Sequence, residues 1–109
     1  MHIYHIVLPK VWEGWKDRSF YEAPSLASEG FIHCSFEEQL DQVIGRYYSA
    51  ARELVILTID SGKLVSKLVS EPSTGNEHYP HVYGPINADA IIRVELRQNL
   101  PVPTASIDA

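Results

Sequence analysis

Three histidines and one tyrosine occupy positions where a polar side chain needs a partner. His5 lies in the apolar run "HIYHIVLP", and His33 lies in "EGFIHCS", which also holds the only cysteine. Burying an imidazole without a partner costs about 2 kcal/mol or more, so each ring must bond to the fold or to a ligand. His81 and Tyr83 lie in "YPHVYGPI", where two prolines restrict the backbone. These four residues are the first candidates for binding and catalysis.

Each of these features also has a purely structural interpretation. A single histidine in an apolar strand is most often hydrogen-bonded inside the core, and a tyrosine between prolines often packs in a turn. Two histidines in the same setting favour a shared polar pocket. If "YPHVYGPI" is extended, His81 and Tyr83 project on the same side of it. A segment held rigid before binding also loses less entropy when a ligand arrives. The sequence leaves both interpretations open.

The residues around His33 disfavour a metal site. On a strand through residues 31–35, Phe31, His33 and Ser35 face one way, while Ile32 and Cys34 face the other. The chain has no C-x-x-C or H-E-x-x-H spacing to supply further ligands, so we expect no bound metal. Cys34 is most simply a small buried apolar residue. A histidine brought to its face from elsewhere would make it a candidate catalytic thiol.

Length and composition limit the classes of protein to which the chain could belong. With 109 residues, 45% of them hydrophobic, it fits one domain, which we expect over residues 1–103 with a frayed tail at 104–109. The formal net charge of −5 and the dispersed basic residues disfavour nucleic-acid binding. A local pocket for one phosphorylated small molecule is still compatible with this charge.

The same numbers suggest where the protein works. No apolar run approaches the roughly 20 residues that cross a bilayer. The first residues lack the pattern of a secretory signal, and a single cysteine cannot form an internal disulfide. We therefore expect a cytoplasmic protein with no membrane or nucleic-acid partner.

The elements that must position these residues follow from the hydrophobic pattern. Apolar runs predict a central strand at residues 2–8 and further strands at 31–35, 54–60 and 90–96, with a short edge segment before Pro103. Residues 64–69 fit either a helical turn or a strand. Residues 70–84 are dense in Pro, Gly, Ser and Asn, which predicts a long loop. We expect Glu71 and Glu77 of that loop to face water.

Two helical segments are predicted. Residues 25–30 give a short helical turn that ends at Gly30. Ser35 and Glu38 have capping-box spacing, which predicts the main helix from Ser35 to about Ala51. One apolar stripe on this helix should face the core, and it comprises Leu40, Val43, Ile44, Tyr47 and Tyr48. The sum is an α+β domain with mainly antiparallel sheets, one main helix and short helical turns.

Two tryptophans in "WEGW" form a separate aromatic feature. Trp12 and Trp15 are expected to cover an edge of the core. Beside a cleft, such a pair would instead stack on a planar ring.

The order of the segments "IYHI", "SLASEGFIHCS", "ELVILTID" and "PHVYGPI" resembles a bacterial family known as domain of unknown function 952. The resemblance runs from His2 to about Leu96. That family is similar to the ADP-ribosyltransferase-like fold, and most closely to RNA 2′-phosphotransferases, which use NAD. The resemblance implies a split pair of mainly antiparallel sheets whose cleft accepts a nicotinamide dinucleotide.

The resemblance also implies roles for individual residues. His5 would match a first-strand histidine that holds the adenosine ribose, and His33 a second-strand histidine, with Ser35 nearby. The segment carrying Tyr83 would complete the ligand site. The chain departs from the phosphotransferases in lacking their N-terminal RNA-binding domain and their basic residues for the 2′-phosphate, so transfer from RNA is not expected. It also lacks a glutamate recognisably equivalent to the one that orients the nucleophile in many ADP-ribosyltransferases.

Three functions follow from these observations. The first is an NAD-dependent transferase, with His33, His81 and Tyr83 as catalytic residues and with His5, His33, Ser35 and Tyr83 holding the cofactor. Such a site must fix the substrate conformer and stabilise developing positive charge. The second is a noncatalytic module that binds or senses a nucleotide, which the missing glutamate favours. The third is an interaction domain whose histidines are bonded internally.

Overall fold

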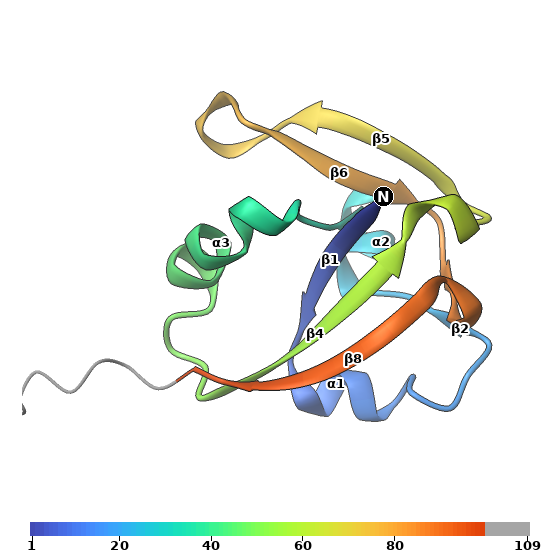
Figure 1. Ribbon diagram of the computed structural model, residues 1–109, viewed down its shortest axis with the longest axis horizontal. Coiled ribbons are helices and arrows are strands. Elements are labelled where there is room, and N and C mark those ends of the chain that lie inside the picture. Colours follow the sequence, from blue (N-terminus) through green and yellow to red (C-terminus); the bar gives the residue numbers. More distant parts are fainter. Residues whose placement is uncertain (100–109) are drawn as a thin grey trace, which may run out of the picture.

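A computed structural model of the protein describes residues 1–99 (Figure 1). The predicted tail at 104–109 lies outside the described residues. The predicted edge segment before Pro103 extends beyond them. The fold is α+β, as predicted, and every strand pairing within the described residues is antiparallel. The strands are β1 (His2–Val7), β2 (Phe20–Tyr21), β3 (Ile32–His33), β4 (Glu53–Asp60), β5 (Lys67–Pro72), β6 (His78–Tyr83), β7 (Ile86–Asn87) and β8 (Ile91–Gln98).

The helices are short. The α-helices are α1 (Pro9–Glu13), α2 (Pro24–Glu29) and α3 (Leu40–Tyr47), and the 3-10 turns are η1 (Glu37–Gln39), η2 (Ser61–Lys63), η3 (Thr74–Asn76) and η4 (Ala88–Ala90). Within residues 1–99, none of them has the length and apolar character that a membrane crossing requires.

The strands form two three-stranded sheets and one small pair. One sheet has the order β1-β4-β8, the other has the order β3-β6-β5, and β2 pairs with β7. Tyr4 of β1 and Ser35 join the two larger sheets by exchanging backbone hydrogen bonds of 2.8 and 2.7 Å. Figure 1 shows the β5–β6 hairpin above the β1-β4-β8 sheet, with α3 to one side. The junction at Ser35 places the strand with His5 beside the strand with His33.

The central strand of the first sheet is β4, and the prediction that residues 2–8 form a central strand was wrong. β4 buries apolar side chains on both faces, namely Leu54, Val55, Ile56, Leu57 and Ile59. β1 also carries apolar side chains on both faces, and a separate core cluster packs against each face. In the sheet it pairs with β4 alone, and its outer edge is closed by the bridge to Ser35.

The predicted long loop at residues 70–84 is a β-hairpin. Strands β5 and β6 pair over their full lengths, from Lys67 opposite Tyr83 to Pro72 opposite His78. The turn residues of this segment are concentrated between the strands, where Gly75 and Asn76 take positive φ angles of 71° and 63°. The pairing also decides the conformation of residues 67–69, which are part of a strand.

The main helix begins and ends inside its predicted limits. Ser35 does not cap it, because the helical segment begins one residue later, at Glu37 of η1, with Phe36 in the N-cap position. Instead the Gln39 side chain accepts a hydrogen bond from the Phe36 N–H at 3.0 Å, and it donates one to the His78 carbonyl at 2.9 Å. The buried Gln39 thus ties the start of the helix to β6. At the other end, α3 stops at Tyr47 rather than at Ala51.

Gly84 is required where the chain leaves β6. Its φ angle is 151°, and a Cβ atom there would lie 2.5 Å from Ser66 Oγ and 3.0 Å from Ser66 Cβ. Ser66 cannot turn away freely, since its hydroxyl donates to the Pro85 carbonyl at 2.6 Å. We expect Gly84→Ala to lower the free energy of unfolding by about 1–3 kcal/mol in denaturant titrations.

A second glycine provides the matched control for this prediction. Gly45 lies in α3, and a Cβ atom there would have no heavy atom within 4 Å. Gly45→Ala should therefore stabilise the protein by up to about 1 kcal/mol through helix propensity. If the two variants unfolded at the same denaturant concentration, the assigned role of Gly84 would be wrong.

Candidate functional site

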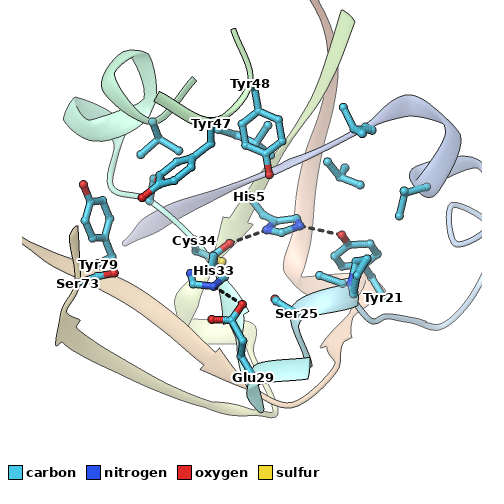
Figure 2. Close-up of a pocket in the computed structure, with 18 of the residues that line it drawn as sticks. His5, Tyr21, Ser25, Glu29, His33, Cys34, Tyr47, Tyr48, Ser73 and Tyr79 are labelled. Carbon is cyan, nitrogen blue, oxygen red and sulfur yellow. Dashed lines mark hydrogen bonds and ion pairs between the residues drawn. The ribbon is translucent and has the colours of Figure 1, made fainter. Parts of the chain in front are cut away.

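A cavity of about 660 Å³ opens between β1, α2, β3 and α3 (Figure 2). Its volume lies inside the range of roughly 300–1,000 Å³ that is usual for small-molecule sites. The lining is mostly apolar and aromatic, with a few hydroxyl groups and one hydrogen-bonded pair of a histidine and a carboxylate. It comprises His5, Ile6, Val7, Leu8, Val11, Tyr21, Ala23, Pro24, Ser25, Glu29, His33, Cys34, Ser35, Val43, Tyr47, Tyr48, Ser73, Thr74 and Tyr79.

His5 forms part of the cavity wall with both ring nitrogens engaged. Nδ1 donates to the His33 carbonyl at 2.6 Å, because a carbonyl can only accept. Nε2 lies 2.7 Å from the Tyr21 hydroxyl. Burial lowers the pKa of His5 from 6.5 to about 4, more than the bond to His33 offsets, so the ring is neutral at pH 7 and Nε2 accepts from Tyr21. Figure 2 shows the ring between these two partners.

His33 and Glu29 form a hydrogen-bonded pair at the cavity rim. His33 Nε2 lies 3.0 Å from Glu29 Oε2, and the two side chains are 48% and 50% exposed. Glu29 is the last residue of α2, and Gly30 ends that helix with a left-handed φ of 87°. The Ser25 hydroxyl donates to the Phe31 carbonyl at 2.8 Å, which fixes α2 against the start of β3. The carboxylate therefore orients an imidazole that solvent or a ligand can reach.

Tyrosines supply most of the aromatic surface of the cavity. Tyr21 and Tyr79 are buried, whereas Tyr47 is 59% exposed at the end of α3. The Tyr47 hydroxyl lies 2.7 Å from Thr74 Oγ1, so the helix end meets the hairpin turn there. The sequence pattern does not indicate that these tyrosines line one cavity. The helical spacing of Tyr47 places it in the apolar stripe that faces the core. The polar hydroxyl group of its side chain is the only feature of the sequence that indicates a position at a cavity instead.

Among residues 1–99, no lysine or arginine lines the cavity. A cation lies beside it, however, because the Arg46 guanidinium is 6.0 Å from the centre of the Tyr47 ring. The pKa of Tyr79 is raised mainly by burial, and Arg46 partly opposes that rise. Positive charge is therefore available at the Tyr47–Tyr79 end of the cavity and not inside it.

Cys34 packs as an apolar residue, as the sequence suggested. It is a free and buried cysteine, and burial raises the pKa of its thiol far above the ordinary value. A thiol held protonated in this way is a poor nucleophile. In residues 1–99 no group of three or more His, Cys, Asp or Glu side chains is arranged to hold a metal ion.

His81 and Tyr83 form a second cluster that does not line the cavity. They project on the same side of β6, and both donate to Glu71 Oε1 of β5, His81 through Nδ1 at 2.9 Å. The expectation that Glu71 faces water holds only in part, since its side chain is 34% exposed but its carboxylate binds both of these residues. The Phe31 ring stacks on His81 with centroids 4.1 Å apart, and the His33 ring lies 5.4 Å from that of His81. His33 is thus the only predicted catalytic residue on the cavity.

Two details complete this second cluster. His81 Nε2 is buried and has no hydrogen-bond partner within the described residues. Glu77 was also expected to face water, but it accepts from Gln42 Nε2 at 2.9 Å and from the Tyr79 hydroxyl at 3.2 Å. The catalytic roles of His81 and Tyr83 stay predictions.

Tyr83 is expected to control the titration of Glu71. The pKa of Glu71 is lowered, first by the hydrogen bond from Tyr83 and then by that from His81. Tyr83→Phe should therefore raise the pKa of Glu71 toward its ordinary value, as measured by the pH dependence of its carboxyl resonance in NMR. Tyr79→Phe is the control, since that hydroxyl donates to Glu77. An unchanged Glu71 titration in Tyr83→Phe would contradict this assignment.

The fold resembles solved structures of one bacterial protein. The X-ray structure of protein CC0527 from Caulobacter crescentus superposes with a TM-score of 0.80 at 24% identity, covering 100% of both chains. The NMR structure of the same protein gives a TM-score of 0.75 at 26% identity, covering 95% of this chain and 88% of that one. These similarities support the fold and give no information about activity. No curated protein matches the sequence.

One family model matches most of the chain. It is described as "Protein of unknown function (DUF952)", and it covers residues 6–94, which include the last two residues of β1, the cavity-lining residues from Ile6 onward and the Glu71 cluster. The chain therefore belongs to the DUF952 family.

Proposed function

We propose that the cavity binds NAD or a related nucleotide, with a planar ring and a ribose inside and the phosphates at the opening. The observation that carries this proposal is the cavity lining itself: tyrosine rings and hydroxyl groups beside the oriented His33–Glu29 pair. Aromatic rings offer stacking surfaces to a base or a nicotinamide. Carboxylate, imidazole and hydroxyl groups are suitable partners for ribose hydroxyls.

The lining residues fit one half of such a ligand better than the other. A pyrophosphate needs cations or free backbone amides, and no lysine or arginine of residues 1–99 lines the cavity. Arg46 lies beside Tyr47, which lines the cavity, so the phosphates are best placed at that end. The ligand would therefore enter with its nucleoside part first. A likeness to ADP-ribosyltransferases forms part of this proposal. The two separate antiparallel sheets, which meet at Ser35 beside the cavity, are compatible with it.

His5 has a supporting role in this proposal. Both of its ring nitrogens are bonded within the protein, so its side chain holds the His33 backbone and presents a ring face to the ligand. Ser35 is buried, lines the cavity and joins β1 to the residues after β3. These contacts fix the backbone on which the exposed His33 ring is presented.

A second candidate function is group transfer from the bound nucleotide, of ADP-ribosyl or nucleotidyl type. One observation favours it: a carboxylate holds His33 Nε2 at 3.0 Å, as in sites where an acid orients a general base. His33 would then take the proton of an acceptor group. His81 and Tyr83 lie off the cavity, so they would take part only with an acceptor bound on their side of β6.

Calorimetry and thermal shift with NAD, NMN, AMP and adenosine test the proposal on the full chain. At a nucleotide concentration of 100 times Kd, binding should add about 2.7 kcal/mol to the stability. His33→Ala should weaken binding. His78→Ala should not, since that exposed histidine does not line the cavity. No binding by any of the four compounds would refute the proposal. Release from NAD of nicotinamide, as in ADP-ribosyl transfer, or of NMN, as in nucleotidyl transfer, would distinguish a transferase from a binding module if it were lost in His33→Ala.

A further inference from the structure

His81 carries a buried nitrogen without a partner. Its side chain is 5% exposed, and Nδ1 donates to Glu71 Oε1 at 2.9 Å. A carboxylate only accepts, so the proton in this bond belongs to Nδ1, and in the neutral ring Nε2 is left as an acceptor. Nε2 is buried and has no hydrogen-bond partner within residues 1–99. Because a buried acceptor without a donor is unfavourable, His81 Nε2 calls for a donor close by.

The neighbouring ring that has a donor is that of His33. His33 lies directly opposite His81 in the pairing of β3 with β6, so the two side chains are on the same face of the sheet. Their ring centres are 5.4 Å apart and their planes are at 80°. Because ring nitrogens lie about 1 Å from the ring centre, two imidazoles joined by a bond of about 3 Å have centres roughly 5 Å apart. The rings are therefore at bonding separation, and Phe31, which also packs on His81, has no donor to offer.

The present partner of His33 does not hold it firmly. His33 Nε2 bonds to Glu29 Oε2 at 3.0 Å, and the two side chains are 48% and 50% exposed (Figure 2). Pairs exposed to water contribute little to stability, and exposed side chains change rotamer within nanoseconds. A hydrogen bond to a buried acceptor is stronger, because water does not compete for it. Glu29 and His81 thus compete for the same N–H group.

We infer that the His33 ring has a second position, in which it donates to His81 Nε2 and not to Glu29, and that His81 is a positioning residue for His33. Glu71 holds His81 in turn, and Glu71 also accepts from the Tyr83 hydroxyl. The N–H group of His33 changes only its acceptor, so no proton passes between residues. Residues that do not line the cavity act on it in this way through His33.

The second position changes the cavity on its Glu29 side. Glu29 and His33 both line the cavity. With His33 turned to His81, the Glu29 carboxylate is free to accept from a ligand hydroxyl, and a buried partner sets the direction of the imidazole. A ligand that donates to Glu29 therefore favours the second position. This consequence rests on the proposed nucleotide site, whereas the two ring positions belong to the protein without ligand.

NMR of the full chain with ¹⁵N-labelled histidine, without nucleotide, tests the second position. Glu29→Ala removes the competing acceptor, so it should shift the His81 Nε2 resonance toward the value of a bonded nitrogen. It should also give a ¹⁵N–¹⁵N coupling between His33 and His81 across the hydrogen bond. Glu22→Ala is the control, because it removes an equal charge from an exposed residue outside the cavity. It should leave the resonance as in the wild type.

His33→Phe distinguishes His33 from any other donor. Phenylalanine covers His81 Nε2 with a ring but cannot donate, so this resonance should take the value of an unbonded nitrogen. A bonded Nε2 in His33→Phe would mean that another donor, such as a buried water, satisfies it, and would overturn the inference. The same resonance in wild type, Glu29→Ala and His33→Phe would also overturn it.

NAD provides a separate arm of the test. At saturation it should shift the wild-type resonance of His81 Nε2 in the same direction as Glu29→Ala does. Binding of NAD without this shift would refute the link between ligand and ring position. Absence of NAD binding would refute the nucleotide site, and the comparison of the variants would still decide whether His33 has two positions.

Discussion

Acidification from pH 7 to pH 4 is expected to remove about 3 kcal/mol of unfolding free energy through His5 alone. The pKa of His5 is lowered from 6.5 to about 4 in the folded protein, mainly by burial. The unfolded chain therefore takes up the proton first as the pH falls. The stabilising contribution of the neutral ring is complete above pH 6.5 and is lost between pH 6.5 and about pH 4.

The measurement compares the wild type with His5→Gln in denaturant titrations at several pH values. Glutamine keeps one donor and one acceptor but does not titrate, and other acid-sensitive groups cancel in the difference between the two proteins. We expect the stability difference between wild type and variant to change by about 3 kcal/mol, against the wild type, between pH 7 and pH 4. Parallel stability curves would mean that the pKa of His5 is not lowered in the folded protein, which would contradict this assignment.

The second large effect concerns Tyr21, which joins His5 to the aromatic edge of the core. Its side chain is 1% exposed, its hydroxyl bonds to His5, and both Trp12 and Trp15 contact its ring edge-on. Tyr21→Ala should lower the unfolding free energy by about 3–5 kcal/mol, as expected for loss of a buried aromatic ring. Tyr21→Phe should lower it by only about 1–3 kcal/mol, by leaving His5 Nε2 unpaired.

These two variants separate ring packing from hydrogen bonding. Denaturant unfolding gives the stabilities, and an NMR titration of His5 gives the second readout. In Tyr21→Phe the aromatic ring remains, but the hydroxyl group that donates to His5 Nε2 is removed. If Tyr21→Phe were as stable as the wild type, the bond to His5 would contribute nothing and the wall of the cavity would rest on packing alone.

The local sequence predicted most strands but not always their partners. The run around His5 was identified as a strand, and its pairing with β4 and Ser35 depends on residues far away in the chain. The loop prediction for residues 70–84 was wrong because it used the total content of Pro, Gly and Asn in the segment and not their positions. In the fold they are separated, with the turn at Gly75–Asn76 and Pro80 tolerated in β6 opposite Ser70.

The candidate site was predicted in part for the same reason. Strand alternation placed His33 and Ser35 on one face, and both line the cavity. Alternation also placed His81 and Tyr83 together, but it could not show that Glu71 of the neighbouring strand binds both. Tyr47 at the helix end fits both a core stripe and a cavity wall. Only the tertiary contacts distinguish these two environments.

Nucleotide binding in the cavity beside His5 and His33 is the proposal on which the assigned residue roles depend. The most direct measurement is an NMR titration of the isotope-labelled full chain with NAD at pH 7, following backbone amides and histidine rings. We predict saturable shifts at Glu29, His33, Ser73 and Thr74, and none along β8. A spectrum unchanged at millimolar NAD, or shifts confined to residues that do not line the cavity, would contradict the proposal.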